Sequence, residues 1–185
     1  MNSPILIKKN DKFFVEDVCI DSIIEKFATP AYIYSKQRIV DNFKNLESAF
    51  KNVDHMICFA VKANSNIAIL NLLAKNGAGF DIVSGGELRR VIAADGDPKK
   101  IVFSGVGKTS EEIKLAIENN ILAFNIESED ELSRIQEIAK SLNKKASISI
   151  RVNPDVNANT HPYISTGLKE NKFGVSEESA LNLYK

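Results

Sequence analysis

Long hydrophobic runs, an excess of charge of one sign and cysteine are all scarce in this sequence. No apolar stretch approaches the roughly 20 residues that span a bilayer, and the apolar run near the N-terminus has no small-residue cleavage site after it. The 24 basic and 24 acidic residues give no long-range attraction to nucleic acid or to an anionic membrane. Two cysteines form neither a disulfide framework nor a metal cluster. These absences predict a cytoplasmic protein with no nucleic-acid partner, no membrane partner and no bound metal.

A repeating unit of apolar run and amphipathic segment fills the chain from residue 56 onward. Each run is followed by a polar turn and by apolar residues at helical spacing, and the starts of the runs recur about every 20–25 residues. Such a series is typical of βα units in a parallel sheet. The five predicted strands are 56–61, 79–83, 100–103, 121–126 and 146–152.

Two architectures contain five consecutive βα units. A doubly wound sheet needs a reversal of strand order and usually a glycine-rich first turn. A (β/α)₈ barrel of the TIM type needs three further units, so the chain is expected to be an incomplete piece of a longer protein. Residues 4–20 read as a hairpin around Asn10–Asp11. We therefore predict an α/β fold with a segment 1–30 that belongs to a missing β-domain, followed by a partial barrel over 31–185.

The predicted helices begin with a repeated pattern. Ser84–Glu87, Thr109–Glu112 and Ser128–Glu131 each fit S/T-x-x-E directly after a predicted strand. In a capping box the hydroxyl accepts from the amide three residues on, and the glutamate accepts from the amide of the first residue. Three complete capping boxes are expected.

Lys62 ends the apolar run "CFAVK", where an unpaired ammonium would be costly if it were buried. A lysine among apolar groups loses its charge readily and can form a Schiff base with an aldehyde. The alternative is a side chain that extends past the strand end into water. Asp81 lies within the second strand and Arg151 ends the fifth, so these two and Lys62 are expected to meet one another or a charged ligand. The capping pattern alone would account for Glu87.

Two further segments are candidates for a functional role. "SGVGKT" ends like a phosphate-binding P-loop, but Val102 stands where that motif needs glycine, so a polar loop at the rim is the better interpretation. The segment 153–174 follows the fifth strand and is too long for a passive connector. It is therefore predicted to overhang the site, with His161 on the substrate side, although a lone loop histidine is more often simply solvated.

Several stretches together resemble one family. They are "FAVKANSN", "GFDIVSGGEL", "SGVGKT", "NIESEDEL" and, most specifically, "RVNPDVNANTHPYISTGLKENKFGV". The sequence is similar to the diaminopimelate decarboxylase family, within the alanine-racemase-like (fold-type III) pyridoxal-phosphate enzymes. The resemblance runs from about residue 25 to the end and implies a TIM-type barrel with a separate β-domain.

The resemblance also implies roles for individual residues. Lys62 matches the catalytic lysine that holds pyridoxal 5′-phosphate as a Schiff base, and Asp81, Glu87 and Arg151 match cofactor-pocket residues, with the loop of His161 close by. The implied activity is decarboxylation of meso-2,6-diaminoheptanedioate to L-lysine, in lysine biosynthesis, by a full-length homodimer. The 185 residues alone are expected to be inactive, because the other pocket residues of the family have no match here.

Two alternatives stay open at this point. A related pyridoxal-phosphate decarboxylase of the ornithine or arginine type would share "AVKAN". A barrel homologue without catalysis would act as a binding protein, although such a protein has no need for an amine at Lys62.

Overall fold

The computed structural model describes residues 5–153 and 174–184, which form two compact units divided between His55 and Met56. Predicted His161 lies outside the described residues, as does nearly all of its loop. The predicted boundary at residue 30 lies within the first unit. Among the described residues no helix is long and apolar enough to cross a membrane.

The first unit contains a small antiparallel sheet and two helices. Its elements are β1 (Leu6–Lys9), β2 (Lys12–Val15), β3 (Val18–Cys19), α1 (Ile20–Phe27) and α2 (Lys36–Ala49). Lys9 pairs with Lys12 across a two-residue turn in which Asn10 and Asp11 both have positive φ. That geometry suits the twist of a hairpin and favours Asn and Asp, so the predicted hairpin is confirmed.

The second unit is a parallel sheet in which every strand lies beside its neighbour in the sequence. Its order is β4-β5-β6-β7-β8 without a reversal, all pairs being parallel. This order is that of a barrel wall rather than of a doubly wound sheet, and the prediction of a partial barrel is confirmed. The strands are β4 (Cys58–Ala60), β5 (Gly79–Ile82), β6 (Ile101–Phe103), β7 (Ala123–Ile126) and β8 (Ile148–Ile150).

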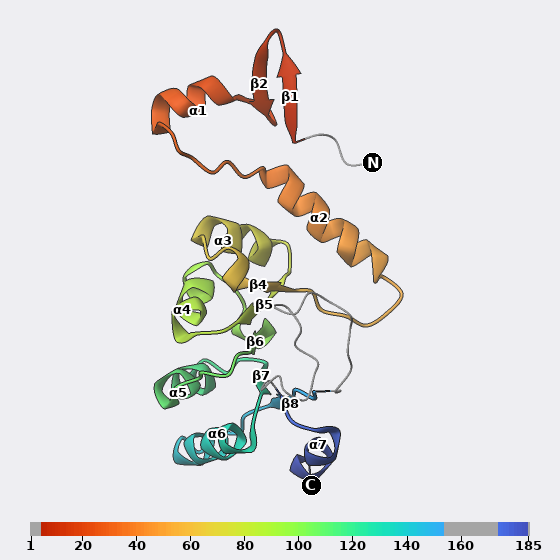
Figure 1. The fold of residues 1–185 in the computed structure, drawn as a ribbon, viewed down its shortest axis with the longest axis vertical. Coiled ribbons are helices and arrows are strands. Elements are labelled where there is room, and N and C mark those ends of the chain that lie inside the picture. The colour runs from red at the N-terminus through yellow and green to blue at the C-terminus, as the bar shows by residue number, and fades with distance from the viewer. Residues whose placement is uncertain (1–4, 154–173, 185) are drawn as a thin grey trace. The chain divides into compact units, whose positions relative to one another are not determined.

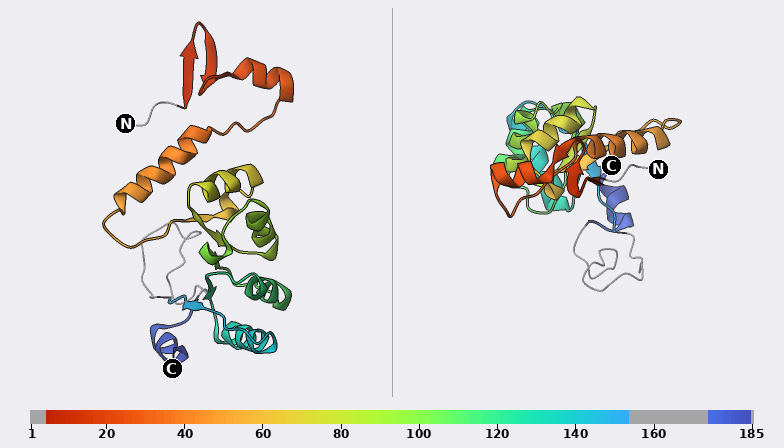
Figure 2. Two further views of the ribbon diagram at one scale, coloured as in Figure 1. Left: turned by 180° about the vertical axis from the view of Figure 1, so that it is seen from behind. Right: turned by 90° about the horizontal axis from the view of Figure 1, so that it is seen from above.

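Four helices of the second unit connect successive strands, and a fifth follows β8. The four are α3 (Ile67–Lys75), α4 (Gly85–Ala93), α5 (Ser110–Glu118) and α6 (Glu129–Ser141), and the fifth is α7 (Glu177–Leu183). Short 3-10 turns are η1 (Val61–Ala63) and η2 (Pro98–Lys100). Figure 1 and the view from behind in Figure 2 show α3 to α6 following one another on the same side of the sheet.

Strand alternation divides the sheet into two unlike faces. The face toward the helices is apolar, and six of its residues are fully buried, namely Phe80, Ile82, Ile101, Phe103, Phe124 and Ile126. The register places small and polar residues on the opposite face, namely Ala60, Asp81, Val102, Ala123 and Asn125. These are only half-buried among the described residues. In a closed barrel this second face points to the interior, so functional side chains gather at its C-terminal edge.

Candidate functional site

Lys62 lies in η1, one residue beyond the fully buried Val61 that follows β4. It therefore stands at the C-terminal edge of the sheet, beside the β5 strand that carries Asp81. The side chain is exposed among the described residues, which agrees with the alternative of a lysine that extends past the strand end into water. The cause is the 3-10 turn, which carries the backbone out of the strand before Lys62 is reached. An exposed primary amine is accessible to a small aldehyde.

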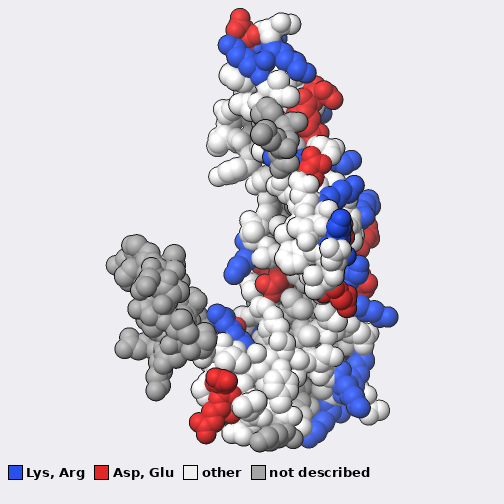
Figure 3. All heavy atoms as spheres, turned by 90° about the vertical axis from the view of Figure 1, so that its right-hand side faces the viewer, with Lys and Arg blue, Asp and Glu red and all other residues white. Residues whose placement is uncertain are grey.

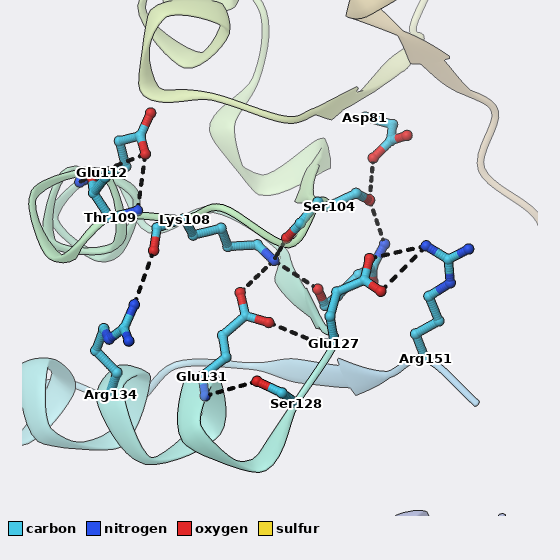
Figure 4. A network of polar contacts seen from close by, with 12 residues as sticks. Asp81, Ser104, Lys108, Thr109, Glu112, Glu127, Ser128, Glu131, Arg134 and Arg151 are labelled. Carbon is cyan, nitrogen blue, oxygen red and sulfur yellow. Dashed lines mark hydrogen bonds and ion pairs between the residues drawn. The ribbon is translucent and has the colours of Figure 1, made fainter. Parts of the chain in front are cut away.

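Asp81 belongs to a chain of polar contacts across three neighbouring strands. Ser104 directly follows β6, and its Oγ donates a hydrogen bond of 2.5 Å to the Asp81 carboxylate. Asn125 in β7 donates from Nδ2 to the same Oγ, at 2.9 Å. Because the amide supplies a proton to Ser104, the hydroxyl is left to donate its own proton to Asp81. The three residues, called the aspartate arm below, hold one carboxylate in a defined orientation (Figure 4).

Arg151 pairs with a carboxylate that the sequence interpretation did not select. Its Nη1 lies 3.1 Å and 3.3 Å from the two carboxylate oxygens of Glu127. The side chain of Glu127 is only 6% exposed and that of Arg151 is 43% exposed, so the positive charge is the part that water can reach. The pairing of Ile126 with Ile150 places the two following residues next to each other. Glu127 and Arg151 are called the arginine arm below. Arg151 thus has a partner, but Glu127 is not one of the partners that the sequence interpretation named.

Lys108 is the most completely buried charged side chain of this network. Its Nζ lies 2.6 Å from Glu131 Oε1 and donates to the carbonyl oxygens of Gly105 and Asn125, at 2.6 Å and 2.9 Å. The Lys108 side chain is 0% exposed and that of Glu131 is 8% exposed. The interpretation of 104–109 as a polar rim loop is therefore wrong for its lysine. Gly105, with φ of +95°, turns the loop back so that Lys108 enters the protein.

The helix starts agree with the capping prediction only in part. In all three, the hydroxyl accepts from the amide three residues on. The complete capping box forms at Thr109–Glu112 alone. Glu87 and Glu131 instead accept from the amides of Val83 and Glu127, one residue before the cap.

The difference follows from the backbone of the cap residue. Ser84 and Ser128 have φ of −157°, whereas Thr109 has φ of −79°. In the more extended conformation of Ser84 and Ser128, the glutamate accepts from the amide of the residue before the cap instead of from the cap amide. Glu87 thus braces the turn after β5, directly beyond Asp81.

These residues suit pyridoxal phosphate in the type of groups that they offer. The exposed Lys62 amine can take up an aldehyde, Asp81 presents a fixed carboxylate for a cationic group, and Arg151 offers a partly exposed cation to an anionic one. Charges of both signs are interspersed over the face that Figure 3 shows. Among the described residues no cluster of His, Cys, Asp and Glu could hold a metal ion.

The fold and these groups define a class of protein. Residues 36–185 match the pyridoxal binding domain of pyridoxal-dependent decarboxylases, and the chain belongs to this family. The cofactor prediction, pyridoxal 5′-phosphate, is confirmed by that membership.

Individual relatives narrow the comparison. The chain is 53% identical over 176 residues to diaminopimelate decarboxylase of Pseudomonas aeruginosa, covering 95% of this chain and 42% of that relative. It is 55% identical to diaminopimelate decarboxylase of Haemophilus influenzae, covering 96% of the chain and 43% of the relative. The chain thus spans less than half the length of these curated relatives.

Solved structures of diaminopimelate decarboxylases also match this chain. Diaminopimelate decarboxylase from Helicobacter pylori, complexed with L-lysine, superposes with a TM-score of 0.85 at 51% identity, over 89% of this chain and 42% of that one. The enzyme from M. jannaschii, in co-complex with L-lysine, gives a TM-score of 0.87 at 44% identity, over 97% and 43%. An arginine decarboxylase of Paramecium bursaria Chlorella virus, at 22% identity and a TM-score of 0.73, shares the fold.

Sequence reasoning missed Ser104, Asn125, Glu127, Lys108 and Glu131. A signal existed for Ser104 and Glu127, because each directly follows an apolar run, as Arg151 does. Asn125 is a polar residue within such a run. No sequence signal distinguishes Lys108 from an ordinary loop lysine.

Proposed function

We propose that the protein containing this chain is a diaminopimelate decarboxylase, which converts meso-2,6-diaminoheptanedioate to L-lysine with pyridoxal phosphate. The observation that carries the proposal is the position of Lys62, an accessible amine at the end of β4, next to the strand that carries Asp81, in a chain about half identical to enzymes of that name. The predicted homodimer and cytoplasmic location form part of the same proposal.

In this proposal the charged residues of the chain have different roles. Lys62 would hold the aldehyde carbon of the cofactor through Nζ, and its amine would carry a proton to or from the reacting carbon. Asp81, oriented by Ser104, would balance a positive charge of the cofactor. The cofactor supplies the electron sink for the electron pair that departing CO₂ leaves behind.

The arginine arm would act at the mouth of the site. Arg151 pairs with Glu127 and is 43% exposed, so its positive charge would attract an anionic group. Glu87 would contribute through the turn it braces, because its Oε2 accepts the Val83 amide at 2.7 Å. His161, on the substrate-side loop, remains a proposed contact.

Borohydride reduction of the intact protein tests the role of Lys62. After incubation with pyridoxal phosphate, peptide mass spectrometry should find a phosphopyridoxyl group on Lys62. Lys62→Ala should lose that modification and all turnover while keeping its far-UV circular dichroism. Lys114→Ala is a matched control, because Lys114 is an exposed lysine in a 3.9 Å surface pair with Glu118. A modification on another lysine, or turnover by Lys62→Ala, would refute the assignment.

Product analysis tests the substrate separately. Release of CO₂ and L-lysine from diaminopimelate, with no release from ornithine or arginine, is expected. Turnover of ornithine or arginine instead would favour the related decarboxylases. Modified Lys62 without turnover of any of the three substrates would favour a binding protein.

A further inference from the structure

The two polar arms of the site converge on a single buried ion pair. Lys108 donates to the backbone carbonyl of Asn125, the residue whose side chain ends the aspartate arm. Glu131 accepts, through Oε2 at 2.7 Å, from the backbone amide of Glu127, the residue that begins the arginine arm. The Lys108–Glu131 contact of 2.6 Å joins these two connections (Figure 4).

Lys108 and Glu131 use their hydrogen-bonding groups to bind each other and the surrounding backbone. Each of the three protons of the Lys108 ammonium can meet one of its three acceptors, which are Glu131 Oε1 and two backbone carbonyls. Both oxygens of Glu131 are engaged, one by Lys108 and one by the Glu127 amide. An arrangement with this many directional bonds has one favourable geometry, since any shift of the loop would break several of them.

Stability alone does not account for burying these charges. Removing two charged groups from water is costly, and well-packed apolar residues of similar size are often equally stabilising. The fully buried ring of Phe103 has its centroid 5.7 Å from Lys108 Nζ, so apolar side chains could be accommodated there. An apolar pair could not form hydrogen bonds with the backbone of Asn125 and of Glu127.

We propose that Lys108 and Glu131 are positioning residues, which set the spacing between the Asp81 carboxylate and the Arg151 guanidinium for the bound cofactor and substrate. This inference rests on the proposed function. Neither residue touches the reacting atoms in this scheme. Lys108 acts through the backbone of Asn125 and Glu131 acts through the backbone of Glu127.

The test is a double substitution in the intact protein that contains this chain. Lys108→Met with Glu131→Leu removes both charges together, so that no unpaired charge is left buried. We expect a Tm close to that of the unsubstituted protein, but about tenfold or more weaker binding of pyridoxal phosphate to the apoprotein. We also expect a shifted absorbance maximum of the bound cofactor and a kcat that falls more than KM changes.

Lys144→Met is the matched control. Lys144 Nζ also has three acceptors, the carbonyls of Ile117 and Glu118 and the side chain of Asn120. These acceptors lie at the C-terminal end of α5, toward the opposite end of the strands. The same chemical change there should lower Tm while leaving cofactor affinity and absorbance unchanged.

The outcomes separate this inference from the proposed function. If the unsubstituted protein neither binds pyridoxal phosphate nor releases CO₂, the proposed function fails. If it does both, and the double variant matches it in affinity, absorbance and kcat, the pair is only structural and the inference is overturned.

If the double variant does not fold, the single variant Glu131→Gln tests the positioning role. This variant keeps the size of the side chain and one acceptor oxygen. Weaker cofactor binding at an unchanged circular dichroism spectrum supports the inference, and unchanged binding overturns it.

Discussion

The Glu112 carboxylate accepts a hydrogen bond of 2.7 Å from the backbone amide of Gly85, although the two residues lie 27 positions apart. Gly85 is the first residue of α4, and Glu112 also closes the capping box of α5. One carboxylate therefore serves the N-termini of two neighbouring helices. The Gly85 bond, followed by that from the Thr109 amide, lowers the pKa of Glu112 below its ordinary value.

A pH-dependent loss of stability follows from this lowered pKa. A group with a depressed pKa in the folded state stabilises it fully above the unfolded-state pKa, about 4.3. The contribution is lost as the pH falls through the lower folded-state value. Glu112→Gln should therefore reduce the free energy of unfolding by about 1 kcal/mol at pH 7, and the difference should shrink toward zero in acid.

Urea denaturation of the intact protein at pH 7, 5, 4 and 3 measures this difference. Glu118→Gln is the control, because the Lys114–Glu118 contact is 3.9 Å long and largely exposed. Its effect should be small at every pH. A constant difference between Glu112→Gln and the unsubstituted protein over the whole range would contradict the assignment.

Gly79 provides a test of strand packing. A Cβ at this position would lie 2.6 Å from the Lys100 carbonyl oxygen and 2.8 Å from Cys58 Sγ. Because that carbonyl belongs to the backbone, Gly79→Ala should destabilise the protein by about 1–3 kcal/mol. Gly107→Ala is the matched control, since a Cβ there meets nothing within 4 Å. Equal Tm values for the two variants would show that the sheet adapts without cost.

Two substitutions of Arg151 distinguish the effect of its charge from the effect of the guanidinium shape. Arg151→Met leaves the buried Glu127 carboxylate without its cation and should cost about 1–2 kcal/mol, reduced by water at the exposed site. Binding of the cofactor or substrate should weaken as well. Since one nitrogen contacts both carboxylate oxygens, Arg151→Lys should recover part of the affinity. Isothermal titration with pyridoxal phosphate measures this recovery, and a lysine variant no better than methionine would show that the guanidinium shape is required.

The 185-residue chain on its own is expected to associate. Within the described residues, β4 pairs only with β5 and β8 only with β7, so the sheet has two open edges. Open edges and an incompletely covered parallel sheet promote contacts between chains. Sedimentation velocity should show size increasing with concentration, and the chain should release no CO₂ from diaminopimelate. A monodisperse, active preparation would contradict this expectation.

The sequence by itself determined the order and type of the elements of the second unit. Apolar runs such as 79–83 alternate with helical periodicity, and hydrophobic burial enforces both patterns locally. The same regularity placed Lys62 and Arg151 at the ends of strands, and Asp81 within a strand, of one predicted sheet. A strand end is a position along the chain, and such positions can be read without knowing the fold.

Only the tertiary structure decided which charges meet. The Ile126–Ile150 register brings Glu127 to Arg151, and the turn at Gly105 sends Lys108 inward to Glu131. These pairs are separated by 23 or 24 residues, and loop side chains follow no period that fixes their direction. The 3-10 turn that exposes Lys62 and the φ of −157° at Ser84 and Ser128 are likewise set by surrounding contacts. Hydrophobic patterning determines which elements form, but hydrogen-bond geometry among distant loops determines how the site is assembled.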